Sequence, residues 1–165
     1  MKSTLFLFLL LPSLTALADL QNSDTKESLR GLNGVFVISQ LIDTKPEGLS
    51  TNNIQKTVEA TLHAAGIQVD TKPQNAHGDA NLSITVNTVK DAQLGLYLFM
   101  VQVTVIQKVQ LTRQSHAQPV AAQTWTRNIQ GLTSPDRVDV IEQAIKQCVN
   151  MFTDDYWKVN PRPKQ

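Results

Sequence analysis

The stretch from Leu94 to Leu111, "LGLYLFMVQVTVIQKVQL", limits the possible folds of this chain more than any other segment. From Tyr97 onward its apolar residues recur at every second position, and mainly Gln, Thr and Lys stand between them. A period of two is typical of a β-strand, because successive side chains point to opposite faces. A membrane-spanning helix needs roughly 18 apolar residues in a row and would bury glutamines and Lys108 in hydrocarbon. The stretch therefore predicts a long β-strand.

The N-terminal residues 1–18, "MKSTLFLFLLLPSLTALA", have the three parts of an export signal. Lys2 provides the positive start, and the apolar run that begins at Leu5 is far shorter than the roughly 20 residues that span a bilayer. Ala16 and Ala18 are the small residues that a signal peptidase admits. We expect cleavage after Ala18 and a periplasmic or secreted protein. Asp19 follows in place of a lipid-bearing cysteine, so a lipoprotein is not expected; an uncleaved anchor is the alternative.

Charge and cysteine content exclude several classes of protein. Of the 15 Lys and Arg residues only Lys2 lies in the signal, so 14 remain against 14 Asp and Glu. This balance argues against a nucleic-acid binder and against a polybasic membrane surface. Cys148 is the single cysteine, so no internal disulfide can form and the hydrophobic core alone must hold the fold.

The remaining elements follow from periodicity and from capping residues. Residues 35–42 are apolar at positions of both parities, which predicts an inner strand buried on both faces. A helix is expected between a Ser50 N-cap and Gly66, followed by a short strand at "IQVD". Residues 80–89 alternate as a half-buried strand, and "QTWTRNIQG" reads as the strand that returns beside the long one. "TSPDR" predicts the start of a last helix, with Ser134 as its N-cap.

These elements predict an α+β fold with two layers. A mostly antiparallel sheet of four strands would carry two helices on one face, in the order β-α-β-β-β-α. We expect a signal peptide at 1–18, a flexible lead-in at 19–30, one domain at 31–158 and a disordered tail at 159–165.

Motifs for catalysis or metal binding are weak in this sequence. Cys148 lies on the apolar stripe of the last helix and has no base nearby in the sequence, so we read it as structural. Trp125 is expected in the core rather than stacked on a ligand. His77 and Asp79 share a loop without a second ligand cluster. Asp154 and Asp155 are interpreted as a solvated helix end rather than a catalytic pair. No cofactor, no metal and no catalytic residue is expected.

One surface is left without an internal role. If Tyr97 and its alternating companions face the helices, the opposite face of the strand begins with apolar side chains. We expect Val86 opposite Phe99, because this register aligns the core faces. It would place Asn87 beside Leu98, and Thr85 beside Met100. The predicted partner face consists of Leu94, Leu96, Leu98, Met100, Thr85 and Asn87. Exposed apolar patches often mark a partner or ligand site.

The alternative for this face is that another part of the chain covers it. The candidates are the N-terminal segment around Leu20 and Leu29, and the chain near Tyr156 and Trp157.

The segments "LRGLNGVFV", "AAGIQV", "GLYLFMVQVTVIQKVQL", "TWTRNIQG" and "YWKVNP" resemble a family of small exported bacterial proteins of uncharacterised function. The resemblance covers roughly residues 29–161 and implies no activity. In architecture the chain is also similar, more loosely, to small α+β modules that serve envelope assembly at the bacterial outer membrane.

Three hypotheses about function follow. The first is an exported, envelope-associated binding or assembly domain without catalysis, which binds an envelope protein, an apolar ligand or itself. The second is a periplasmic carrier of a small apolar ligand or lipid, with the same residues lining a cavity between the layers. The third is an envelope hydrolase.

Overall fold

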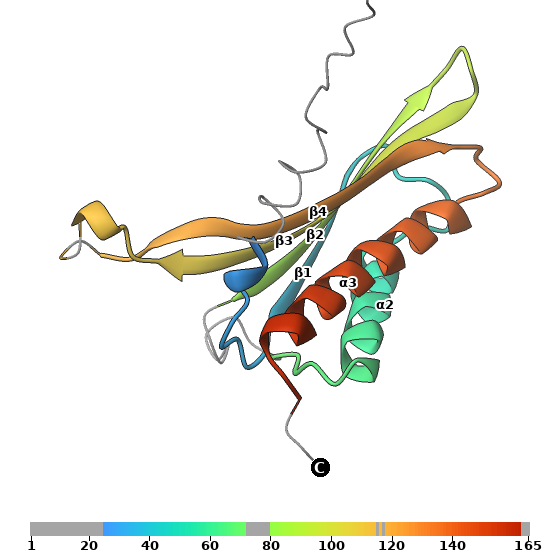
Figure 1. Cartoon of the computed structure of the whole chain (residues 1–165). Coiled ribbons are helices and arrows are strands. Elements are labelled where there is room, and N and C mark those ends of the chain that lie inside the picture. The colour runs from blue at the N-terminus through green and yellow to red at the C-terminus, as the bar shows by residue number, and fades with distance from the viewer. Residues whose placement is uncertain (1–24, 72–79, 115, 117, 163–165) are drawn as a thin grey trace, which may run out of the picture.

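The computed structural model describes residues 25–71, 80–114, 116 and 118–162. Its four-stranded sheet has the order β1-β2-β3-β4, with β1 parallel to β2 and the other neighbours antiparallel. Both α2 and α3 lie on one face of this sheet (Figure 1). The elements are β1 (Phe36–Asp43), α2 (Thr51–Ala64), β2 (Asn81–Asp91), β3 (Leu96–Val109), η2 (Thr112–Gln114), β4 (Val120–Thr133) and α3 (Asp139–Val159). The predicted two-layer α+β class and the order β-α-β-β-β-α are therefore confirmed.

The core lies between the sheet and the two helices. β2 contributes Leu82, Ile84 and Val86, and β3 contributes the odd-numbered residues of its apolar alternation. The stripe of α2 is Ile54, Val58 and Leu62, as its spacing predicts. On α3 the buried apolar residues include Ile141, Ile145, Cys148 and Phe152. Trp125 of β4 is almost fully buried, which confirms its expected place in the core.

The first strand is an edge strand, and the prediction of an inner strand is wrong. β1 pairs only with β2, and Val37 is its only fully buried residue. Phe36 and Ile38 on the opposite face are half-buried. The apolar run on both faces of β1 therefore reflects one core face and one half-buried face, not two buried faces.

The register of β2 against β3 differs from the prediction by two residues. Val86 lies opposite Val101, not Phe99, and Ile84 lies opposite Val103. The hairpin loop spans residues 92–95, and Asp91 Oδ1 accepts hydrogen bonds from the backbone N–H groups of Gln93 and Leu94 at 2.8 Å each. A shift of two keeps every side chain on its face, so the apolar pattern alone cannot detect it. The loop selects the register.

The two helices begin in different ways. Ser50 caps α2 by accepting a hydrogen bond from the Asn53 N–H at 3.2 Å, and Gly66 ends it at φ +75°. Both features are as predicted. The expected N-cap of the last helix is wrong, because α3 begins at Asp139 after Val138. Ser134 instead belongs to a turn, in which the Arg137 N–H donates to the Ser134 carbonyl at 3.0 Å.

The folded part of the chain begins before residue 31. Leu29 is fully buried, so the last residues of the expected lead-in belong to the core. The Tyr156 hydroxyl donates to the Leu32 carbonyl at 2.7 Å, and Asn160 Nδ2 donates to the Leu29 carbonyl at 2.8 Å. The segment from Thr25 is therefore anchored against the C-terminal end of α3. The expected signal peptide at 1–18 lies outside the described residues.

Asp155 is buried and paired, which corrects the interpretation of Asp154 and Asp155 as a solvated helix end. One oxygen, Asp155 Oδ2, accepts from Arg127 at 2.7 Å and from the Trp125 indole N–H at 3.2 Å. The other accepts from Lys158 at 3.2 Å. Asp154, in contrast, is exposed. Because α3 continues to Val159, Asp155 faces the sheet and ties α3 to β4.

We expect Asp155→Asn to lower the free energy of unfolding by about 1–3 kcal/mol, because it leaves the half-buried Arg127 guanidinium without its counter-charge. Asp154→Asn, the neighbouring exposed position, is the matched control and should change it by less than about 0.5 kcal/mol. Urea unfolding of both variants measures the difference. Equal effects in the two variants would contradict a stabilising role for the Asp155 pairs.

We also expect stability to fall at high pH because of Cys148. Burial raises the pKa of its thiol from 9.0 to about 11. The unfolded chain therefore releases this proton from about pH 9, while the folded chain keeps it, so unfolding becomes easier as the pH rises from 9 to 11. Tyr156, whose pKa burial also raises, adds to the same trend. The slope of stability against pH should be smaller in Cys148→Ala; an unchanged slope would contradict this account.

Candidate functional site

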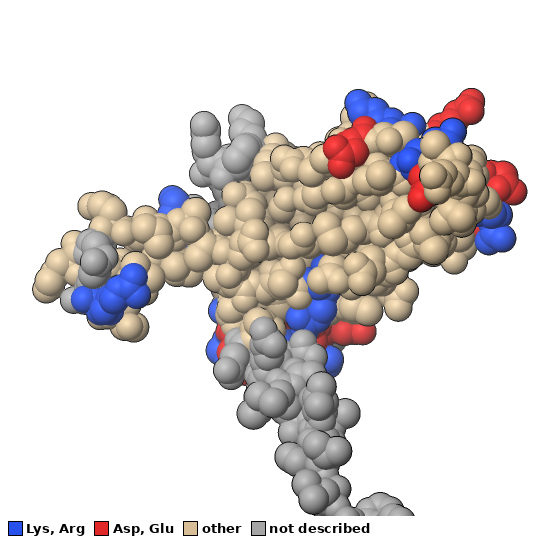
Figure 2. Space-filling model, turned by 90° about the horizontal axis from the view of Figure 1, so that it is seen from above, with Lys and Arg blue, Asp and Glu red and all other residues tan. Residues whose placement is uncertain are grey.

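The face of the sheet that the helices leave uncovered carries no charged side chain between its two ends. The outward-facing positions are Phe36, Ile38, Gln40 and Ile42 on β1; the odd-numbered residues 81–89 on β2; the even-numbered residues 98–106 on β3; and Thr126, Asn128, Gln130 and Leu132 on β4. The charged residues Asp91 of β2 and Lys108 of β3 lie at its two ends. Figure 2 shows a broad uncharged surface, with charged residues gathered towards its margins. We call this surface the outer face.

Exposed apolar residues gather at one end of the outer face. Leu98 of β3 lies between Val89 of β2 and Leu132 of β4, in one row across three strands. These three side chains are 46%, 51% and 57% exposed. Leu94 in the adjoining turn and Ile42 on β1 are exposed as well. Isolated exposed apolar residues are ordinary, but a row of them is a contiguous patch.

A groove of about 460 Å³ lies within this end of the outer face. It is lined by Asn87, Val89, Leu98, Phe99, Met100, Gln130, Gly131 and Leu132. Gly131 of β4 lies opposite Phe99 on the inner face, and a Cβ there would lie 2.9 Å from Cζ of Phe99, so the glycine leaves room for this ring. Asn87 Oδ1 is buried and accepts no hydrogen bond from the described part of the chain. A buried amide oxygen without a donor is energetically costly, so it favours a ligand or partner that brings one.

The structure brings half of the predicted partner face together. Leu98, Met100 and Asn87 line the groove. Leu94 lies in the exposed turn, and Leu96 and Thr85 are half-buried outside the groove. The predicted neighbours are wrong because of the register shift.

Asn87 lies opposite Met100, not Leu98, and Thr85 lies opposite Gln102. That this face binds a partner stays a prediction.

One groove residue lies beyond the expected strand ends, and another gains its meaning only from the observed pairing. Val89 continues the alternation of β2, but its outward position only matters once Leu98 is known to lie beside it. Leu132 lies beyond the expected return strand, because β4 extends to Thr133 rather than ending at Gly131. No alternation signals this extension, because the apolar position changes parity from Ile129 to Leu132 across Gly131.

The described residues of the segments proposed to cover the patch do not lie over it. Leu29 packs into the core between the layers, as does Tyr156. Trp157 donates from its indole N–H to the Ala65 carbonyl at 2.9 Å, at the end of α2. Leu20 lies outside the described residues. Leu29, Tyr156 and Trp157 are thus on the helical side of the sheet.

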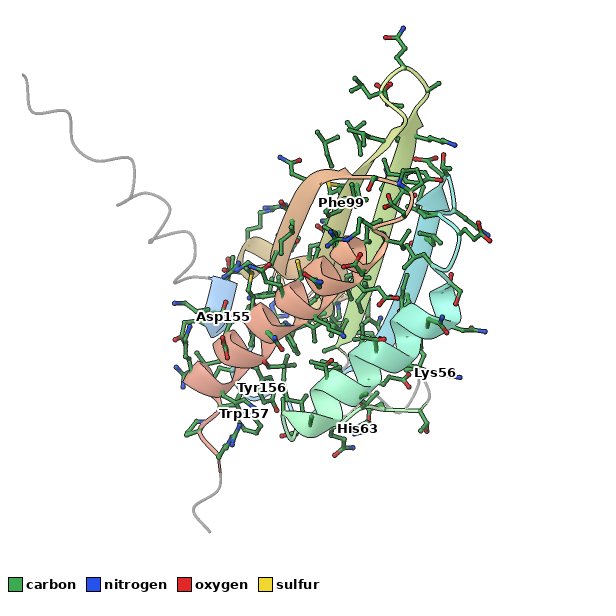
Figure 3. All side chains as sticks on the ribbon, turned by 90° about the vertical axis from the view of Figure 1, so that its right-hand side faces the viewer. Lys56, His63, Phe99, Asp155, Tyr156 and Trp157 are labelled. Atoms are coloured by element: carbon green, nitrogen blue, oxygen red, sulfur yellow. The ribbon has the colours of Figure 1, made fainter. Side chains whose placement is uncertain are left out.

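The residues considered for chemistry do not converge in the described part of the chain. His63 on α2 and His116 beyond η2 are both exposed, and His77 and Asp79 lie outside the described residues. Figure 3 shows His63 and Asp155 on separate helices. Within residues 25–71, 80–114, 116 and 118–162, no group of three His, Cys, Asp or Glu residues could hold a metal ion. The Cys148 thiol is fully buried.

Comparisons with known proteins leave the family of this chain open. No family model and no curated protein sequence matches it. A crystal structure of a minor lipoprotein from Acinetobacter baumannii aligns with a TM-score of 0.32 and 11% identity, over 78% of this chain and 94% of that one. None of the helices in the described ranges is long and apolar enough to cross a membrane.

Proposed function

We propose that this chain is an exported, envelope-associated binding domain without catalytic activity, and that its outer face contacts an envelope protein. The observation that carries the proposal is the exposed row of Val89, Leu98 and Leu132 on a sheet face without charge. Export rests on the sequence of residues 1–18, which reads as a cleavable signal.

The energetics of the patch favour a protein partner. Each large apolar side chain that loses its remaining water contact contributes about 1 kcal/mol, so the patch as a whole can supply a binding hot spot. Asn87 and Gln130 frame the patch with amide groups, which can hydrogen-bond to a partner's backbone. An apolar centre with a polar rim is the usual organisation of a protein–protein interface.

The absence of charge on the outer face limits what the partner can be. Between Asp91 and Lys108 at its two ends, the outer face offers no side chain that can form a salt bridge, so a strongly acidic or basic partner surface would lose hydration there without compensation. The partner surface is therefore expected to be neutral as well. Association with it should depend little on salt concentration, because electrostatic steering is weak.

We expect Leu98→Asp to abolish the capture of the envelope partner, because it places a charge at the centre of the apolar row. A photo-crosslinking residue at Met100, introduced into the chain in cells, would report the captured protein by mass spectrometry. Val120→Asp is the matched control, since Val120 is 45% exposed but lies at the far end of β4. Equal capture by the wild type and Leu98→Asp, or equal loss in both variants, would overturn the proposal.

A second candidate function is the carriage of a small apolar ligand. It is favoured by the volume of the groove and by the unpaired Asn87 Oδ1, which suits a ligand with an alkyl chain and an N–H or O–H donor. The groove is open and lies on the outer face, so it is not the cavity between layers that the sequence suggested.

We expect a fluorescent alkyl amide to bind the wild type with a blue-shifted emission and to lose affinity in Asn87→Leu, which removes the acceptor but keeps the volume. Thr85→Val, on the next row of the same strand, is the control for a general effect on β2. Equal affinity in the wild type and Asn87→Leu would show that the Asn87 amide takes no part in binding the ligand. No binding at all would leave the protein partner as the function of the patch.

A further inference from the structure

The free edge of the sheet is formed by β4, and its backbone groups face outward at the even-numbered positions. The Phe36 N–H donates to the Ala80 carbonyl, so the even-numbered residues of β2 face β1. The backbone groups of the odd-numbered residues of β2 therefore bond to the even-numbered residues of β3. The odd-numbered residues of β3 in turn bond to the residues of β4 that lie opposite them, which are Trp125, Arg127, Ile129 and Gly131. The N–H and C=O groups of Thr126, Asn128, Gln130 and Leu132 therefore point away from the sheet.

The first part of this edge is covered by side chains. Ser28 Oγ donates to the Thr124 carbonyl at 3.0 Å, and Arg127 Nη1 donates to the Thr126 carbonyl at 2.8 Å. For Asn128, Gln130 and Leu132, no described residue makes a hydrogen bond to the outward backbone groups. The open part of the edge thus extends from residue 128 to residue 132.

The opposite edge of the sheet is closed at the start of β1 and just before it. Gln55 of α2 donates from Nε2 to the Val37 carbonyl at 3.1 Å. Val35, just before β1, exchanges backbone hydrogen bonds with Gln68 and Asp70, both within 3.0 Å. A second chain could not add a full strand to β1 without displacing these groups.

The open segment of β4 has none of the features that usually block edge pairing. Native sheets protect such edges with Lys, Pro, a bulge or an inward-pointing charge. β4 has a bulge opposite the Val105–Ile106 pair of β3, where Trp125 and Gln123 are the paired residues. This bulge lies before the open segment. The sequence from 128 to 132, "NIQGL", contains no charge and no proline. This segment is a regular strand whose outward backbone N–H and C=O groups can pair with another strand.

We propose that β4 pairs with β4 of a second copy of this chain, antiparallel and about a two-fold axis at Gln130. This register uses the whole open segment: Asn128 lies opposite Leu132 of the second copy, and Gln130 lies opposite Gln130. About six backbone hydrogen bonds would form, since each such pair in an antiparallel ladder exchanges two. The two sheets would become one continuous sheet.

A second copy fits this edge better than a charged foreign strand. The three side chains that would meet across the junction are neutral, so the segment does not repel itself, and two opposed Gln130 amides can bond to each other. The exported chain has equal numbers of basic and acidic residues, which removes net repulsion between copies. An edge contact buries less than roughly 1,200 Å², so the dimer should dissociate on dilution.

The test is sedimentation equilibrium of the exported chain over a range of micromolar concentrations. The wild type should show a reversible doubling of mass. Asn128→Pro should abolish it, because proline removes an N–H that points to the edge and takes no part in the ladder with β3. Asn128→Ala, which loses the same side chain but keeps the N–H, should dimerise as the wild type does. Circular dichroism confirms that both variants are folded.

A second measurement keeps the test valid if Asn128→Pro does not fold. In the wild type, amide hydrogen exchange at Asn128, Gln130 and Leu132 should slow as concentration rises, while exchange at Thr85 in the sheet centre should not change. A monomer at all concentrations, or a dimer without this protection, would overturn the proposal. Leu98→Asp should leave the dimer intact, so failure here and failure of the proposed outer-face function are distinguishable.

Discussion

The alternation of side chains along β3 is the constraint on which the rest of the structure depends. β3 is an inner strand with both neighbours in place, and Val101, Val103 and Val105 on its inner face are fully buried. Burial of each such side chain contributes about 1.5–3 kcal/mol, so a one-residue slip would lose most of the core. This requirement fixes which face of every paired strand meets the helices. It therefore also fixes which residues form the outer face.

The two sheet faces differ because helices cover only one of them. β2, β3 and β4 extend past the helical layer at their ends, as the hairpins in Figure 1 show. At the end with the 92–95 loop, Tyr97 and Phe99 are still buried on the inner face, while Leu98 between them is exposed on the outer face. A strand that needed only solubility would carry a polar residue at that position. The apolar row across Val89, Leu98 and Leu132 is thus a feature that the core does not require.

The sequence predicts the architecture well because periodicity and capping are local signals. The Ser50 cap, the Gly66 terminus and the inner face of β3 are all visible in short segments. The edge position of β1 is not, because strand order depends on which neighbours pair. The burial of Asp155 is also non-local, since it depends on Arg127 and Trp125 from a distant strand. Of the groove, the residues of β3 and Asn87 could be predicted, whereas Leu132 required the register of β4.

The outer face and the open edge of β4 meet at two residues, and this geometry connects the two proposals. The side chains of Gln130 and Leu132 line the groove, and their backbone N–H and C=O groups form part of the open edge. Pairing about Gln130 would bring the grooves of two copies next to each other on one continuous face. A partner that spans both grooves would then gain affinity from two contacts at high effective concentration, even if each contact is weak. Dimerisation is expected to strengthen binding at the outer face, because the same strand contributes to both surfaces.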